Sequence, residues 1–116
     1  MIPCLLFFFF FPFFSVFFYP FSFGLFICFD IAFQSPAVDL VSMGVRDFLY
    51  AAAIGPLGRD TAARLWSLAH GAALMLANNG KNCSDVFVKG ERVDSTVVDV
   101  EGTEDSFVIA KIPKDN

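Results

Sequence analysis

The first 29 residues of this 116-residue chain contain no charged side chain, and this segment restricts the choice of fold more than any other. Fourteen of the 17 phenylalanines lie between Phe7 and Phe33, and the first basic residue is Arg46. The run is longer than the roughly 20 apolar residues that cross a hydrocarbon core. Three prolines within the first 20 residues argue against a membrane-spanning helix, because each removes a backbone donor.

The same segment has the composition of a translated pyrimidine-rich tract. From Cys4 to Phe29, 20 of 26 residues are Phe, Leu, Pro or Ser, which have codons that begin with two pyrimidines. A secretory signal fits poorly, because no basic region precedes the apolar run. The sequence therefore predicts two parts: residues 1–34, which are either translated non-coding sequence or a membrane anchor, and a domain over residues 35–116.

The second part has the charge balance of an ordinary soluble domain. Residues 43–116 hold 8 basic and 10 acidic side chains. The formal charge of the whole chain is −4, so there is no basic patch to neutralise phosphates. Nucleic acid is therefore not an expected partner.

Two short elements are expected before the first clear helix. Residues 38–43 alternate in polarity and predict a strand, and Gly44 supplies a turn. Residues 47–54 predict either the second strand of a hairpin or a short helix, because the run is both aromatic and rich in alanine. Residues 55–58 form a turn in this interpretation, and Asp60 is the expected N-cap of the helix that follows.

One long helix is predicted over residues 61–77. Its apolar positions recur at the spacing of a 3.6-residue repeat, and Gly80 is suited to the position just past the C-terminus of a helix. The members of this apolar stripe are Leu65, Leu68, Ala69, Ala72, Met75 and Leu76.

After the helix the period changes to two, which predicts strands at residues 85–89, 95–100 and 106–112. Turns at residues 90–91 and 102–103 make these an antiparallel meander. The last strand is apolar on both faces and is expected in the centre of a sheet. The expected fold is α+β: an antiparallel five-stranded sheet with one long helix, in the order β-β-α-β-β-β, after the apolar leader. A domain of about 80 residues buries only about 60 to 65% of its unfolded surface, which favours a dimer.

No set of catalytic residues emerges from the sequence. His70 is the only histidine, and the three cysteines Cys4, Cys28 and Cys83 follow no pattern. These counts give no two-histidine metal site, zinc site or disulfide framework. The sequence therefore predicts no catalytic residue, no metal and no cofactor. The expected core consists of Leu65, Leu68, Ala72, Met75, Leu76, Phe107 and Ile109. The candidate interface residues are Trp66, His70, Ala73, Asp85, Val86, Phe87 and Val88.

Residues 38–113 resemble the roadblock family in the order of their elements. The resemblance is carried by the opening hairpin at residues 38–54, the Gly58-Arg59-Asp60 loop before the helix, and the closing apolar run at residues 106–113. It implies a roadblock/longin-like sandwich. The run at residues 48–52 and the helix start at residues 60–63 are most similar to the short adaptor subunits of the Ragulator complex.

This resemblance implies a non-catalytic scaffold. Such a subunit would form a heterodimer with another roadblock-type subunit through the helix at residues 61–77 and the edge strand at residues 85–89. The assembled complex would recruit Rag GTPases to the cytosolic face of the lysosome or late endosome in amino-acid signalling to mTOR, with indirect membrane association. The alternatives are a dynein-associated light chain and a small subunit anchored by a single membrane span.

Overall fold

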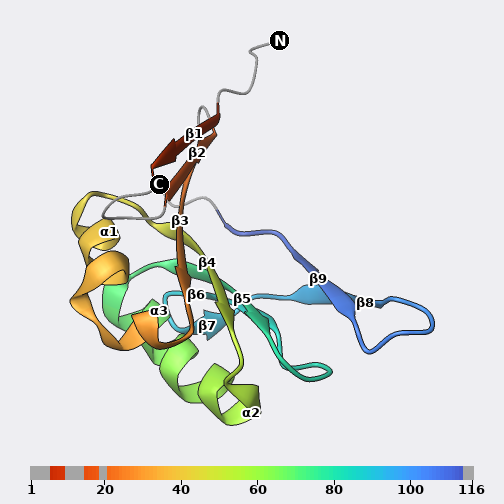
Figure 1. Cartoon of the computed structure of the whole chain (residues 1–116). Helices are drawn as coiled ribbons and strands as arrows, with labels where there is room; N and C mark the ends of the chain where they lie inside the picture. Colours follow the sequence, from red (N-terminus) through yellow and green to blue (C-terminus); the bar gives the residue numbers. More distant parts are fainter. Residues whose placement is uncertain (1–5, 10–14, 19–20, 114–116) are drawn as a thin grey trace.

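A computed structural model describes residues 6–9, 15–18 and 21–113, and its largest element is a seven-stranded sheet with the strand order β1-β2-β3-β4-β5-β6-β7 (Figure 1). The strands β3, β4 and β5 are parallel to one another, and the other neighbours pair antiparallel. A separate antiparallel ribbon joins β8 and β9. The bounds are β1 Leu6–Phe9, β2 Ser15–Phe18, β3 Phe21–Ile27, β4 Asp47–Ala52, β5 Ala73–Asn78, β6 Asp85–Val88, β7 Glu91–Arg92, β8 Ser95–Asp99 and β9 Ser106–Ala110.

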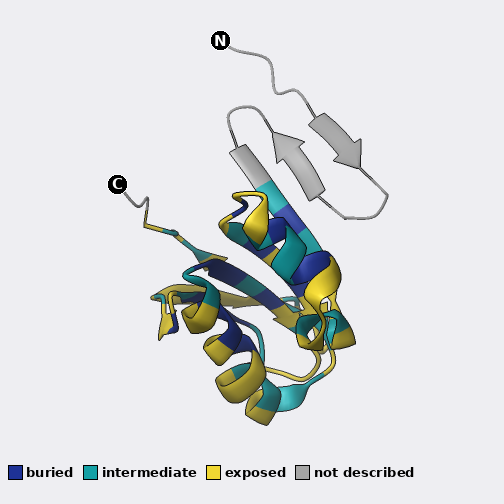
Figure 2. Ribbon diagram, turned by 90° about the vertical axis from the view of Figure 1, so that its left-hand side faces the viewer, coloured by how far each residue is buried: buried dark blue, intermediate teal, exposed yellow. Residues whose placement is uncertain are grey.

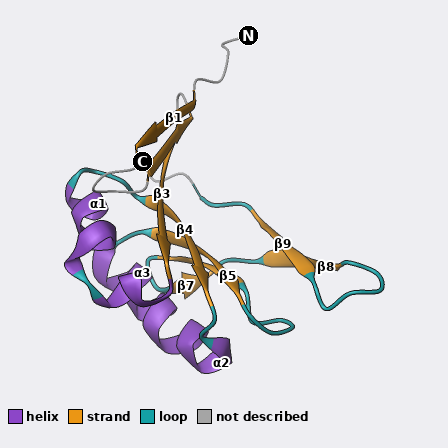
Figure 3. Ribbon diagram, viewed as in Figure 1, coloured by secondary structure: helices purple, strands orange, loops and turns teal. Residues whose placement is uncertain are grey.

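Helical connections join the parallel strands, as parallel pairing requires. The connection from β3 to β4 holds η1 Cys28–Ala32, η2 Gln34–Val38 and α1 Asp39–Ser42. The connection from β4 to β5 holds α2 Gly55–Gly58, η3 Arg59–Ala63 and α3 Arg64–His70, which follow one another without a break. Figure 3 shows both groups of helices on the same side of the sheet.

The core lies between the sheet and these helices, and four aromatic rings fill its centre. The Trp66 ring packs on Phe26 and Phe48 with centroid separations of 4.9 and 5.0 Å. Phe26 stacks on Tyr50 at 4.6 Å. Gly24 makes room for this cluster, because a Cβ atom there would lie 2.5 Å from the Phe48 ring. Figure 2 shows the exposed positions on the outer sides of the helices.

Part of the predicted apolar leader therefore contributes to this core. Phe26 is buried against residues of β4 and α3, and residues 24–27 of β3 pair with residues 48–51 of β4. The expected boundary between residues 34 and 35 falls inside η2. Residues 1–5, 10–14, 19 and 20 of the leader lie outside the described residues. Within the described ranges, no helix is both long and apolar enough to cross a bilayer.

The predicted long helix is wrong in its second half. The helix ends at His70 because Gly71 adopts the left-handed conformation, with φ 59° and ψ 37°. The amide of Ala72 then donates to the Ser67 carbonyl at 3.0 Å, which closes the last turn. Residues 73–78 continue as β5, whose apolar positions happen to extend the helical spacing. The helix also starts earlier than predicted, at Gly55, so Asp60 lies inside it.

The predicted opening hairpin is also wrong. Residues 38–42 are helical and Met43 lies in the turn that follows, because Ala37 and Leu40, spaced by three, are both buried against the sheet. The run at residues 47–54 does form a strand, β4, but its neighbours are the parallel strands β3 and β5. The antiparallel five-stranded sheet of a roadblock/longin-like fold is therefore replaced by a mixed sheet.

Strands form at the three places predicted after residue 80, as β6, β8 and β9. The predicted meander is wrong, because β6 pairs with the short strand β7 while β8 and β9 form a separate ribbon. The predicted central position of the last strand is wrong, because among the described residues β9 pairs with β8 alone. Phe107 and Ile109, expected in the core, are 64% and 61% exposed. Leu65 and Leu68, also expected there, are 49% and 56% exposed because they lie on the outer side of α3. Ala72 and Leu76 are buried, and Met75 is partly buried.

Candidate active site

The carboxyl ends of the three parallel strands meet at one edge of the sheet, where open α/β sheets commonly bind ligands. Cys28 lies at this edge, directly after β3, with a left-handed φ of 49°. Lys89 also has a positive φ, but Lys89 and Gly90 form a two-residue hairpin loop, and such loops require positive φ angles. Cys28 has no such turn to explain its conformation, which costs roughly 1 to 2 kcal/mol.

Tyr50 holds the strained residue from the neighbouring strand. Its hydroxyl donates a hydrogen bond of 2.7 Å to the carbonyl oxygen of Cys28, and its ring is buried against Phe26. Burial raises the pKa of Tyr50 to about 12, and the nearby negative charges of Cys28 and Asp30 add to this effect. The phenol therefore stays protonated at neutral pH and remains a donor.

Asp30 fixes the other side of the same turn. Its carboxylate accepts a hydrogen bond of 3.0 Å from the backbone amide of Ile27, the last residue of β3. The residues before and after Cys28 are thus tied together, while the Cys28 thiol itself is free and partly exposed. The backbone of Cys28 is therefore held in place, while the residue as a whole remains partly exposed.

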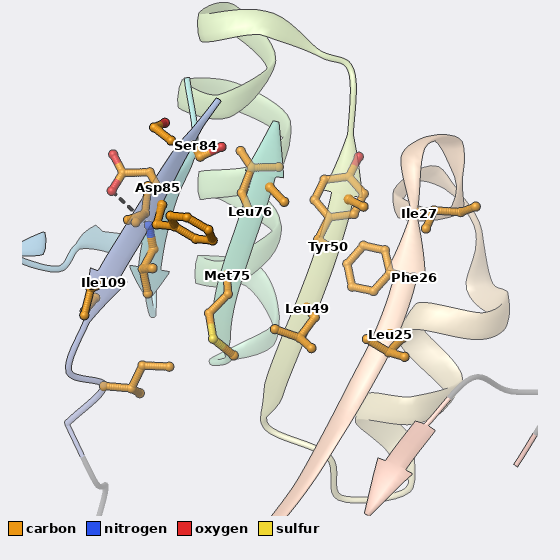
Figure 4. Close-up of a pocket in the computed structure, with 18 of the residues that line it drawn as sticks. Leu25, Phe26, Ile27, Leu49, Tyr50, Met75, Leu76, Ser84, Asp85 and Ile109 are labelled. Atoms are coloured by element: carbon orange, nitrogen blue, oxygen red, sulfur yellow. Dashed lines mark hydrogen bonds between the residues drawn. The ribbon is translucent and has the colours of Figure 1, made fainter. Parts of the chain in front are cut away.

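A pocket of about 810 Å³ lies beside this turn. Ile27, Asp30 and Tyr50 line the end of the pocket near Cys28, and the rest of its lining is mainly apolar. Figure 4 shows Leu25, Leu49 and Met75 in a row across three neighbouring strands. The pocket can therefore take the apolar part of a ligand whose reactive group lies near Cys28.

Two asparagines at the end of β5 fix the neighbouring loop on the same edge. The Asn78 side chain donates to the carbonyl oxygens of Gly55 and Cys83 at 2.8 and 3.0 Å, and it accepts from the amide of Ile54 at 2.9 Å. Asn79 accepts from the amide of Gly55 at 3.1 Å. Hydrogen bonds from these two asparagines therefore fix the loops that follow β4 and β5 at the sheet edge where Cys28 lies.

The candidate interface residues from the sequence do not form an exposed surface. Trp66, Ala73, Val86 and Phe87 are buried, and Val88 is partly buried. His70 is partly buried, with its ring 4.5 Å from that of Trp66. Asp85 is buried and forms an ion pair with Arg92. The described residues contain no group of three or more His, Cys, Asp or Glu side chains suited to a metal ion.

Sequence reasoning missed Cys28, Asp30 and Tyr50. Cys28 and Asp30 lie within residues 1–34, the segment that its composition separates from the predicted domain. Tyr50 lies in the run that the resemblance places in an antiparallel hairpin. One signal was available: the apolar run at residues 23–27 stops at Cys28-Phe29-Asp30, where the first charge of the chain appears. Open α/β sheets bind ligands outside the carboxyl ends of their strands, so a thiol and a carboxylate directly after an apolar run mark a candidate position for such a site.

Tyr50 gives the stability of the chain a specific dependence on alkaline pH. A folded-state pKa of about 12 lies above the usual value of 10, so the stabilisation is complete below pH 10 and is lost as the pH rises toward 12. The loss should amount to about 1 to 2 kcal/mol by pH 11.5. We expect the Tyr50→Phe variant to lack this part of the decline when urea unfolding is followed at pH 9, 10.5 and 11.5. An identical decline in both proteins would contradict the buried position of the phenol.

The strain at Cys28 can be measured with two substitutions. Glycine adopts a φ of 49° without the steric cost that alanine meets. We therefore expect the Cys28→Gly variant to exceed the Cys28→Ala variant by about 1 kcal/mol in free energy of unfolding. The same pair of substitutions at Cys83 serves as the control, since that residue is not in the left-handed region. A Cys28→Gly variant less stable than Cys28→Ala would show that the turn is unstrained.

Comparison with known proteins shows the fold. No family model matches the chain, and no curated protein matches it. Saccharomyces cerevisiae Nit3, a member of branch 10 of the nitrilase superfamily, has a TM-score of 0.53 at 24% identity, over 62% of this chain and 32% of Nit3. A cysteine-to-alanine mutant of the Nesterenkonia AN1 amidase, from the same superfamily, gives 0.53 at 16% identity, over 63% and 32%. The glutamine-dependent NAD+ synthetase of Acinetobacter baumannii gives 0.59 at 16% identity, over 93% and 21%.

These similarities overturn the roadblock resemblance. The chain has a nitrilase-like fold and not a roadblock fold, so the prediction of a Ragulator or dynein subunit is wrong. The alternative of a single-span subunit loses its basis in the leader, because residues 21–27 form the sheet strand β3. The prediction of a protein without enzymatic activity is also corrected, since the similar structures are named as an amidase, a synthetase and a nitrilase-superfamily member. The partners and the lysosomal location depended on that resemblance alone. The chain spans about a third of the length of two of these proteins and about a fifth of the third.

Proposed function

We propose that this chain carries the nucleophile of an amide hydrolase, and that the nucleophile is the thiol of Cys28. The observation that supports this most directly is the strained, left-handed backbone of Cys28 at the carboxyl end of a parallel strand. Strain of this kind persists only where the surroundings enforce it, and it is concentrated at functional sites. Here Tyr50 and Asp30 enforce it through hydrogen bonds to the turn.

The substrate class follows from the chemistry of a thiol and from the names of the similar structures. A thiolate attacks carbonyl carbons and forms a thioester, which water can hydrolyse. One similar structure is an amidase, and another is a synthetase that depends on glutamine, a compound with a primary amide. A primary amide is therefore the substrate that we propose, with its apolar part in the pocket beside Ile27 and Tyr50.

The reaction has two steps. In the first, the sulfur of Cys28 bonds to the amide carbon, the carbon–nitrogen bond breaks, and the nitrogen leaves as ammonia with the thiol proton. In the second, water attacks the thioester, which releases the carboxylic acid and restores the thiol. Tyr50 acts as a positioning residue, because its hydrogen bond reaches the Cys28 carbonyl and not the sulfur.

The selective reactivity of Cys28 tests this proposal. Cys28 and Cys83 are both free and partly exposed, so exposure alone predicts similar rates of alkylation. With chloroacetamide, an amide that alkylates thiols, we expect Cys28 to react at least about tenfold faster at pH 7, as peptide mapping by mass spectrometry would record. A Tyr50→Phe variant should lose part of this advantage. Equal rates at the two cysteines, or faster reaction at Cys83, would contradict the proposal.

A further inference from the structure

The segment between the end of β5 and the start of β6 is rich in asparagine. It holds Asn78, Asn79 and Asn82, and Asn79 is followed by Gly80. Figure 1 shows this segment extending beyond the sheet as a loop. In an Asn-Gly pair the backbone nitrogen of glycine can attack the asparagine side chain, because glycine has no Cβ atom to obstruct the approach. The reactivity of each asparagine therefore depends on whether the backbone nitrogen that follows it is free.

That backbone nitrogen is free at Gly80 and bound after the other two asparagines. The amide that follows Asn78 belongs to Asn79, and it donates to the Ala52 carbonyl oxygen at 3.2 Å and to the Asn78 side chain at 2.9 Å. The amide that follows Asn82 donates to the Gly80 carbonyl oxygen at 3.4 Å. Among the described residues, the Gly80 amide has no acceptor. Asn79 is therefore the asparagine whose neighbour can act as a nucleophile.

The Asn79 side chain is also arranged to accept this attack. Its oxygen accepts a hydrogen bond of 3.1 Å from the Gly55 amide, a donor that would stabilise the negative charge formed on that oxygen during ring closure. Its nitrogen has no acceptor in the part of the chain that the structure describes, and the residue is exposed. The Asn78 side-chain nitrogen differs, because it donates to two carbonyl oxygens at 2.8 and 3.0 Å. The leaving nitrogen is therefore free in Asn79 and held in Asn78.

We propose that Asn79 is a modification site, at which the chain deamidates itself. The backbone nitrogen of Gly80 bonds to the side-chain carbonyl carbon of Asn79, the carbon–nitrogen bond of the carboxamide breaks, and the NH2 group leaves as ammonia with the proton of the Gly80 amide. Water then opens the succinimide ring at either of its carbonyl carbons, which leaves aspartate or isoaspartate at position 79. The exchange of NH2 for OH adds about 1 Da. The reaction uses no atom of Cys28 and does not depend on the function proposed above.

The isoaspartate product would loosen the edge of the sheet. In isoaspartate the former side-chain carbonyl becomes part of the main chain, which is longer by one carbon atom. The oxygen that accepts from the Gly55 amide is then displaced, and Gly55 loses the bond that ties the loop after β4 to the loop after β5. The modification therefore acts at the same edge of the sheet as the turn at Cys28.

Peptide mapping of the full chain after several days at neutral to mildly alkaline pH tests this proposal. We expect the added mass at Asn79 to form at least about tenfold faster than at Asn78 or Asn82, because a free nucleophile is held beside one side chain alone. The rate should rise roughly tenfold from pH 7 to pH 8, since the Gly80 amide must lose its proton to attack. The Asn79→Gln variant is the matched control and should stay unmodified, because its longer side chain would have to close a larger ring.

A synthetic peptide of residues 76–84 separates the contribution of the fold from that of the sequence. The folded chain should deamidate at least as fast as this peptide, since the Gly55 amide assists the reaction in the folded chain alone. An Asn79 that persists, three asparagines that react at equal rates, or a folded chain at least about tenfold slower than the peptide would overturn the proposal.

Hydrogen exchange at Gly55 tests the effect on the edge. In the isoaspartate fraction the Gly55 amide should exchange at least about tenfold faster than in the fresh chain, and at the rate found in an Asn79→Ala variant, which lacks the acceptor. Exchange at Gly55 that is unchanged by the modification would contradict the loss of this hydrogen bond.

Discussion

Replacing Cys28 by alanine is expected to reduce the hydrolysis of primary amides at least about 1,000-fold, to the uncatalysed background. The reason is that the sulfur forms the bond to the substrate carbon, and alanine offers no atom that could replace it. A loss of this size corresponds to about 4 kcal/mol of transition-state stabilisation. Ammonia release from glutamine or a short aliphatic amide is the measurement.

Cys83→Ala is the matched control for this prediction. Both thiols are free and partly exposed, but Cys83 lies in the loop before β6, beside the end of β5, whereas Cys28 directly follows β3 in the strained turn. The Cys83→Ala variant should keep the activity of the wild type. Activity that survives in Cys28→Ala, or that disappears equally in Cys83→Ala, would show that the thiol of Cys28 is not the nucleophile.

Truncating Phe48 is expected to cause the largest loss of stability. Phe48 is fully buried, packs edge-on against Phe26 and Trp66, and fills the space that Gly24 leaves open. Phe48→Ala removes the ring contacts with Phe26 and Trp66 and leaves a cavity that the surrounding rings can only partly fill. The free energy of unfolding should fall by about 3 to 5 kcal/mol in urea titrations.

This loss is large against the roughly 5 to 15 kcal/mol that stabilises a typical domain. The control is Leu57→Ala, which truncates an apolar side chain that is already in solvent and should change the stability by less than about 0.5 kcal/mol. A Phe48→Ala variant whose free energy of unfolding lies within about 1 kcal/mol of the wild type would contradict the aromatic core. A loss that small is expected when an exposed ring is truncated, and not when a buried one is.

Local patterns predicted some elements of this fold well. The alternating runs after residue 80 form strands, since Gly90 and Gly102 supply the turns that hairpins require. The helix before Gly71 was also predictable, because Trp66 and Ala63 are buried at helical spacing. The error at residues 71–77 has a physical cause: an apolar strand in the middle of a parallel sheet shows no alternation, so its pattern can be assigned to a helix.

The topology and the candidate site could not be predicted in this way. The parallel pairing of β4 depends on β3, which lies in the segment that its phenylalanine content set apart from the domain. If β3 is excluded from the predicted domain, β4 can only be assigned to a hairpin with its sequence neighbours. The contact between Tyr50 and Cys28 then cannot be predicted. The role that we propose for Cys28 is supported by a backbone angle and by a hydrogen bond between residues 22 apart in the chain, and a local sequence pattern predicts neither of these two features.

The most direct test of Cys28 as the nucleophile is to trap the acyl group that it should carry. The full chain would be mixed with glutamine or a short aliphatic amide, quenched in acid within seconds, and analysed by mass spectrometry of its peptides. We expect the mass of the acyl group on the peptide that contains Cys28, absent from the Cys28→Ala variant and absent from the peptide of Cys83. An acyl group found on Cys83, or hydrolysis that proceeds while Cys28 stays unmodified, would contradict the assignment.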